Sequence, residues 1–158
     1  MTILTLRELF DIISFISEGK MYSVVSSNCE PLHLEELHKW FFAEWGEMNP
    51  LVGSNINVVV PAPLMALDSS TLIGGLAFIG HPIPDDKNIG LWINALIVAP
   101  GYRKKGIGSL LVSAAVAEAK RNNVAELFVY THIPMLYKSL GWIELSNDGK
   151  NFTLKCVC

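Results

Sequence analysis

The chain has 158 residues, a formal net charge of -3 and 51% hydrophobic residues. A chain of this length most simply forms one domain, here residues 1–158, with a sizeable buried core. The acidic balance argues against a nucleic-acid partner, because the basic residues cluster locally at 103–105. Charged residues interrupt the apolar N-terminal stretch, so we expect neither a signal peptide nor a membrane span and infer a cytoplasmic protein.

The number and spacing of the cysteines argue against zinc-binding and redox proteins. The three cysteines are Cys29, Cys156 and Cys158, and the last two have C-x-C spacing without histidines close by. This spacing fits neither a zinc site nor a C-x-x-C redox pair. We therefore expect reduced thiols and no metal site.

The first element expected along the chain is an amphipathic helix over residues 4–17. Apolar residues recur there at a spacing of 3.6 from Leu6 to Ile16, and Gly19 follows as a C-cap. Residues 1–20 are thus predicted to be an extra N-terminal helical extension. Such a helix either packs on the sheet or forms a homodimer contact.

The next segments alternate between strands and one longer helix. Residues 22–26 have the pattern of a short strand, and apolar residues gather on one face of a helix predicted over 31–47. The loop at 49–57 contains proline and glycine and is of the kind that can cover a site. Two strands at 63–67 and 71–79 follow as an antiparallel hairpin.

The most informative stretch is a strand, a glycine-rich turn and a helix. Residues 89–98 are apolar and β-branched, a turn-rich link at 81–86 precedes them, and Pro100-Gly101 ends the strand. Gly106 and Gly108 come next, beside a basic triplet. The first amides of a helix have no partner inside it and attract anions, and glycine lets a ligand approach them. The sequence therefore predicts a phosphate cradle.

The remainder of the chain continues the alternation. An alanine- and leucine-rich helix at 107–122 leads to a strand at 125–131, which the crossover rule makes parallel to the strand at 91–98. A short helix at 133–140 and two strands at 142–145 and 152–157 complete the prediction.

Two motifs in this frame resemble the GNAT superfamily of N-acetyltransferases. The first is Arg-x-x-Gly-x-Gly at 103–108 after a strand that ends in Val98-x-Pro100. The second is Tyr137-x-x-x-Gly141-Trp142, about thirty residues further on. The resemblance implies an α+β fold with a central mixed sheet of about seven strands. An antiparallel meander, one parallel pair and flanking helices would make up this fold.

The resemblance also implies acetyl-CoA as co-substrate. In the superfamily the parallel strands splay apart, which would leave backbone groups of Leu96, Ile97 and Val98 to pair with the pantetheine arm. Tyr137 would lie near the sulfur and donate to, or hydrogen-bond with, the departing thiolate. The predicted pyrophosphate-binding residues are Arg103, Lys104, Lys105, Gly106, Ile107, Gly108 and Ser109.

Removal of the amine proton has no obvious agent. Many relatives carry an acidic residue in the central strand where this chain has Asn94-Ala95. Glu44, His81, His132 or a water relay are the candidate bases. His132 and Thr131 also occupy the region where many members place a pantetheine-binding asparagine, which puts that contact in doubt.

The acceptor site is expected around an acidic and aromatic group: Glu44, Trp45 and Trp92. Trp45 and Glu44 end the helix that forms one wall of the acceptor site in the superfamily, and such a lining suits a cationic amine. The resemblance implies acetyl transfer to a small-molecule or peptide amine by direct attack in a ternary complex. A non-catalytic acyl-CoA-binding or sensing module, or a self-associating interaction protein, are the alternatives.

Overall fold

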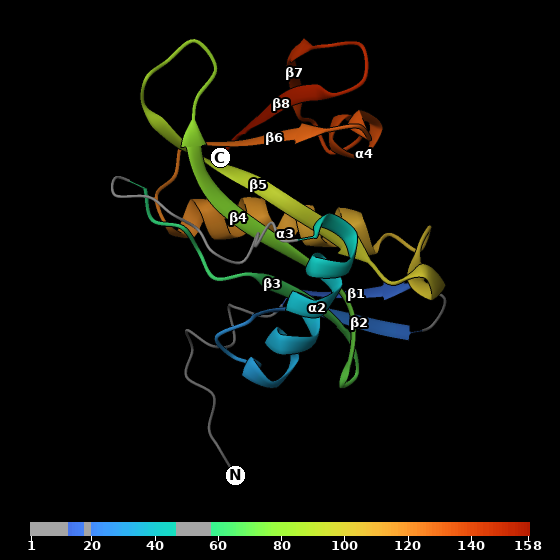
Figure 1. Ribbon diagram of the computed structural model, residues 1–158. Helices are drawn as coiled ribbons and strands as arrows, with labels where there is room; N and C mark the ends of the chain where they lie inside the picture. The colour runs from blue at the N-terminus through green and yellow to red at the C-terminus, as the bar shows by residue number, and fades with distance from the viewer. Residues whose placement is uncertain (1–12, 18–19, 47–57) are drawn as a thin grey trace.

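The computed structural model describes residues 13–17, 20–46 and 58–158 as one mixed sheet with helices on both faces (Figure 1). Its eight strands follow the spatial order β1-β2-β3-β4-β5-β6-β8-β7. The strands are β1 (Ile13–Ser17), β2 (Lys20–Ser26), β3 (Leu64–Asp68), β4 (Thr71–Pro82), β5 (Ile89–Val98), β6 (Glu126–Thr131), β7 (Ile143–Asn147) and β8 (Phe152–Val157). The helices are α2 (Leu34–Trp45), α3 (Ile107–Arg121) and α4 (Pro134–Lys138), with short 3-10 turns at Pro31–His33 and Pro100–Tyr102.

The N-terminal prediction is wrong where the structure tests it. Residues 13–17 form the strand β1, which pairs antiparallel with β2 from Ile13↔Val24 to Ser17↔Lys20. Pairing with a neighbouring strand outweighs the helical spacing, and isoleucine and phenylalanine are favourable strand residues. The sheet therefore has eight described strands where about seven were expected. The rest of the predicted helix at 4–12 and the loop at 49–57 lie outside the described residues.

Two hydrophobic clusters hold the helices on opposite faces of the sheet. Ile107 and Leu111 of α3 are fully buried in the larger cluster, and Leu37 and Phe41 of α2 are fully buried in the smaller one. Figure 1 shows α2 and α3 on the two sides of the central strands. Gly75 of β4 permits the approach of α2, because a Cβ there would lie 2.3 Å from the Leu37 side chain.

The hairpin of β3 and β4 and the long strand β5 confirm the predicted meander. The link expected at 81–86 begins two residues later, since His81 pairs with Gly90 and Pro82 with Ile89 at the end of β4. A hydrogen bond from Trp92 Nε1 to the His81 carbonyl, 3.0 Å long, adds to this pairing.

One parallel pair positions the site. β5 and β6 pair in parallel only from Leu91↔Leu127 to Ile93↔Val129. Beyond that point the two strands diverge (Figure 1), and β5 continues to Val98 beside β4 alone among the described strands. The mixed α+β architecture, the parallel pair and its connection through α3 were all predicted from the sequence and are confirmed.

Candidate active site

A small cleft lies where β5 and β6 part. It has a volume of about 250 Å³ and is lined by residues 93–96 of β5 and by residues 129–133 of β6 and the segment after it. Tyr137 of α4 lines the same cleft. The divergence of the two strands thus brings Tyr137 beside the open edge of β5.

The backbone of β5 offers hydrogen-bonding groups at this edge. The Ala99 amide donates to Ile73 O over 2.8 Å, so residue 99 directs its backbone toward the β4 side. Successive residues of a strand face opposite edges, so Leu96 and Val98 direct theirs toward the β6 side and Ile97 toward β4. The Val98 carbonyl accepts a hydrogen bond from Arg103 Nε over 3.1 Å. Of the three residues assigned to pantetheine, Leu96 and Val98 have the suitable orientation.

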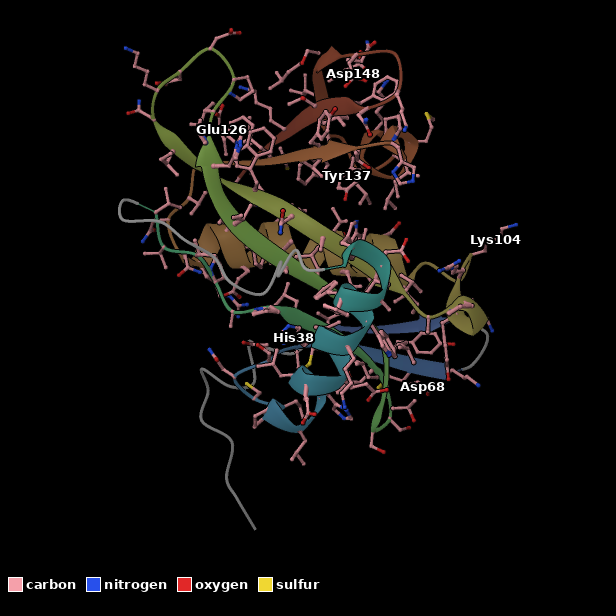
Figure 2. The ribbon with its side chains drawn as sticks, viewed as in Figure 1. His38, Asp68, Lys104, Glu126, Tyr137 and Asp148 are labelled. Atoms are coloured by element: carbon pink, nitrogen blue, oxygen red, sulfur yellow. The ribbon has the colours of Figure 1, made fainter. Side chains whose placement is uncertain are left out.

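The loop before α3 has the geometry of an anion cradle. Gly106 is the N-cap of this helix, with a left-handed φ of +84°, and is exposed. No acidic residue stands in the first turn of α3. Lys104 also has a positive φ, of +61°, and projects from the outer end of the loop (Figure 2). The loop thus places basic residues in the sequence next to the first amides of α3, the groups that favour an anion.

The other predicted cradle residues differ in their burial. Gly108 and Ser109 are half-buried, and Arg103 is exposed. A Cβ at Gly108 would meet only the Leu136 side chain, at 3.6 Å or more, so there is space above this turn. The Ile107 side chain is instead 1% exposed and belongs to the core. Only the Ile107 backbone is available to a ligand.

A hydrogen bond that the sequence does not predict, called the Tyr102–Asp68 brace below, holds this loop in place. The Tyr102 hydroxyl donates to Asp68 Oδ2 over 2.9 Å, which ties the loop to the turn between β3 and β4. Figure 2 shows Asp68 at the end of that hairpin. The Tyr102 ring also meets the buried Tyr22 ring edge-on, with centroids 6.2 Å apart. Asp68 is 34 residues from Tyr102 in the sequence, and no local pattern connects the two.

Tyr137 is a buried residue that lines the small cleft. Its side chain is 2% exposed and packs edge-on against Trp142, with ring centroids 5.1 Å apart. Burial raises the pKa of Tyr137 well above the ordinary value for a tyrosine. The preceding residue, Leu136, lies next to Gly108, so the cradle and Tyr137 are adjacent parts of one surface.

A larger cleft adjoins the small one. Its volume is about 570 Å³, and α2, β4, β5, β6 and β8 all contribute to its walls. Residues shared by both clefts are Trp45, Ile93, Asn94, Ala95 and Tyr130. The two clefts therefore lie next to each other and share a common wall.

The residues expected to bind the acceptor or remove its proton are distributed unevenly. Trp45 lines both clefts, and Trp92 and His81 line the larger one. His132 is exposed and lines the small cleft together with Tyr137. Glu44 is exposed on α2 and is not in the described walls of either cleft.

Asn94 and Tyr130 are site residues that the sequence did not reveal. Ala77 pairs with Ala95 and Phe78 with Ile93, so Asn94 is the extra residue of a β-bulge, a device that re-aims side chains. In the sequence, Asn94 is distinguished only by standing where many relatives have a carboxylate. Tyr130 is 56% exposed, and its hydroxyl donates to Asp148 Oδ2 over 2.5 Å. Residues 127–129 before it are three consecutive apolar residues, so no alternation along this strand distinguishes Tyr130.

The splayed parallel strands, the cradle before α3 and the buried tyrosine define an acyl-CoA-dependent transferase fold. A family model described as an acetyltransferase (GNAT) domain matches residues 64–144, just over half of the chain. The chain belongs to this family. The protein is accordingly an acetyltransferase of the GNAT family.

Solved structures with similar folds cover nearly the whole chain. The GNAT domain of S. lividans PAT is 11% identical, covers 94% of this chain and 98% of its own, and has a TM-score of 0.66. PaiA N-acetyltransferase from Thermoplasma acidophilum, solved with coenzyme A, is 22% identical over 87% of this chain and 99% of its own, with a TM-score of 0.57. Arabidopsis thaliana Naa50, bound to the bisubstrate analogue CoA-Ac-MVNAL, is 14% identical with the same coverage and a TM-score of 0.55. Comparison with curated protein sequences gives no significant match.

Two further observations concern the described part of the chain. None of its helices combines the length and apolar character needed to cross a membrane. Cys156 and Cys158 are free, half-buried thiols, and Cys29 is exposed.

Proposed function

We propose that the protein transfers the acetyl group of acetyl-CoA to a primary amine by direct attack within a ternary complex. The observation that carries this proposal is the common wall of the two clefts, formed by Trp45, residues 93–95 and Tyr130. A donor in the small cleft and an acceptor in the larger one would meet at Asn94. Neighbouring sites of this kind favour reaction by proximity, without a covalent intermediate on the enzyme.

The donor would lie across β5 and α3. Acetyl-CoA supplies the acetyl group as a thioester. The outward backbone groups of Leu96 and Val98 would pair with the amide-bearing arm in the manner of an added strand. The amides of Gly108 and Ser109, with the basic residues at 103–105, would hold the diphosphate.

Tyr137 would act at the departing sulfur. In the reaction a carbon–sulfur bond breaks and a carbon–nitrogen bond forms, while the amine loses one proton and the thiolate gains one. A free thiol has a pKa of about 8.5, well below the raised pKa of Tyr137. Complete proton transfer from Tyr137 to the thiolate is therefore uphill, and hydrogen-bond donation to the sulfur is the role that its burial supports.

His132 would take the proton of the amine, directly or through a water molecule. It lines the small cleft together with Asn94, where the amine would lie, whereas His81 Nδ1 lies 3.1 Å from the Pro82 carbonyl oxygen and Glu44 is outside the described walls of both clefts. A neutral histidine accepts protons near physiological pH. Replacement of His132 by glutamine would then remove a base without removing hydrogen-bonding capacity.

A peptide N-terminus is one candidate acceptor. The structure of Naa50 contains an analogue in which CoA is joined to the peptide MVNAL. This supports testing peptides beside small amines.

The test is release of free CoA thiol from acetyl-CoA in the presence of an amine panel. We expect amine-dependent release with intersecting double-reciprocal plots, because both substrates must be bound together. Parallel plots would indicate a covalent enzyme intermediate and contradict direct attack. Binding of acetyl-CoA without release, across the whole panel, would favour the non-catalytic acyl-CoA-binding module.

Tyr137→Phe provides the matching mutational test. We expect kcat to fall by about a hundredfold with little change in the Kd of acetyl-CoA, since only the hydrogen bond to sulfur is lost. Calorimetry measures the Kd, and a thermal melt verifies that the buried ring still packs on Trp142. Equal losses of turnover and of acetyl-CoA affinity would contradict this role.

A further inference from the structure

The larger cleft has walls that are mainly aromatic and aliphatic. Trp45, Trp92 and Tyr130 supply the aromatic surfaces, and Ile79 and Ile93 the aliphatic ones. The polar side chains among the described lining residues are His81, Asn94 and Thr153, and none of these is a carboxylate. A volume of about 570 Å³ is within the usual range for small-ligand sites.

Trp92 lines this cleft with the apolar part of its indole ring, because its N–H group is bonded elsewhere. The indole N–H donates to the His81 carbonyl over 3.0 Å. One face of the ring stacks on Phe128 with centroids 5.1 Å apart, and the His81 ring meets Trp92 edge-on at 5.4 Å. Trp92 is 8% exposed and is therefore a fixed apolar wall.

Tyr130 also lines the larger cleft, and its polar group is likewise bonded to another part of the protein. Its hydroxyl donates to Asp148, whose other carboxylate oxygen accepts the amides of Lys150 (3.0 Å) and Asn151 (2.7 Å). Figure 2 shows Asp148 at the turn between β7 and β8. The Tyr130 hydroxyl is thus directed to this turn, while its ring lines both clefts.

We infer that the acceptor is a primary amine with an uncharged apolar or aromatic group next to it. This inference rests on the proposed function and specifies its substrate class. The amine would lie at Asn94 in the common wall, and the apolar group would lie between Trp45, Trp92 and Tyr130. A polyamine or aminoglycoside would instead desolvate additional ammonium groups in a cleft whose described walls hold no carboxylate, which is unfavourable.

The same chemistry has two sources, an arylalkylamine and a peptide N-terminus with a large apolar first residue. The experiment compares phenethylamine and a pentapeptide beginning with Phe against spermidine and the same pentapeptide beginning with Gly. We expect kcat/KM to be at least about tenfold higher for one or both apolar acceptors. The better of these two identifies the source. Equal or higher kcat/KM for spermidine or the Gly peptide would overturn the inference and leave acetyl transfer intact.

Variants of α2 test the location of the apolar group. Trp45→Ala should lower kcat/KM about tenfold more for the preferred apolar acceptor than for methylamine, which has no such group. Phe42→Ala is the matched control, because Phe42 is 57% exposed on the same helix and lines neither cleft. An equal loss for methylamine in Trp45→Ala would contradict the placement.

A binding measurement separates this inference from the proposed function. Calorimetry of the CoA-saturated protein with phenethylamine and with spermidine requires no turnover. Selective binding of phenethylamine without acetyl transfer to any amine would refute the proposed function and support the apolar cleft. Absence of phenethylamine binding together with spermidine binding would refute the apolar cleft.

Discussion

The donor side and the acceptor side of the site are built in different ways. The donor side consists of one continuous stretch, from β5 through the glycine loop into α3, with Tyr137 beside it. The acceptor cleft takes its walls from α2, β4, β5, β6 and β8. A site made from adjacent residues leaves a pattern in the sequence, whereas a site assembled from five distant elements does not.

The largest effect is expected on acetyl-CoA affinity, from a substitution within the continuous segment proposed to bind the donor. Gly108→Trp should weaken acetyl-CoA binding by at least about a hundredfold, because an indole would fill the space above the first turn of α3. Calorimetric titration measures this loss. Ser113→Trp is the matched control, since Ser113 is exposed further along the same helix. Retained affinity in Gly108→Trp would move the diphosphate away from this turn.

A smaller effect is expected where the donor side depends on a distant residue. Tyr102→Phe removes the hydrogen bond to Asp68 that ties the loop to the β3–β4 turn. The bond is partly exposed and worth about 1 kcal/mol, so KM for acetyl-CoA should rise about fivefold. The KM of the amine and kcat should change little. An equal rise in both KM values would show that the brace serves the whole fold and not the loop.

The smallest effect concerns the support of the acceptor wall. The hydrogen bond from Tyr130, followed by those from the amides of Asn151 and Lys150, lowers the pKa of Asp148 to about 2. A carboxyl group whose pKa is lower in the folded state stabilises that state above its unfolded pKa, and the benefit is lost as pH falls toward 2. Asp148→Asn should therefore lower Tm by about 1 to 2 °C at pH 7.

The control for this prediction is to measure the same difference in Tm at several pH values. The difference in Tm between the wild-type protein and Asp148→Asn should shrink as the pH is lowered from 5 to 3, because the carboxyl group of the unfolded chain, with its ordinary pKa of 3.8, takes up a proton in this range while the folded state keeps the carboxylate ionised. Thermal melts at a series of pH values measure it. A difference that is constant with pH would show that the charge of Asp148 does not contribute.

Much of the donor side could be predicted because its signals are local. The breaker at Pro100, the left-handed N-cap at Gly106 and the tyrosine before Gly141 each specify backbone or chemistry within a few residues. Tertiary pairing decides the features that were missed. Residues 13–17 have helical spacing but extend along β2, and Tyr130 faces Asp148 only because β8 lies between β6 and β7.

The acceptor residues that were predicted came from composition and family resemblance. Trp45 and Trp92 do line the larger cleft, whereas Glu44 does not belong to its described walls. Asn94 enters the common wall through a bulge, and bulges depend on the register between two strands and not on a local residue pattern. The sequence alone does not determine that register.

The bulge at Asn94 has an evolutionary consequence for β5. It divides the strand into two halves that are out of phase, one that includes Trp92 of the larger cleft and one that includes Leu96 of the small cleft. Substitutions preserve this phase, but insertion or loss of one residue between Trp92 and Val98 would carry the backbone groups of Leu96 and Val98 to the opposite edge. The length of this segment is therefore constrained more tightly than its composition. Acceptor preference can diverge by substitution while the backbone that holds the donor stays the same.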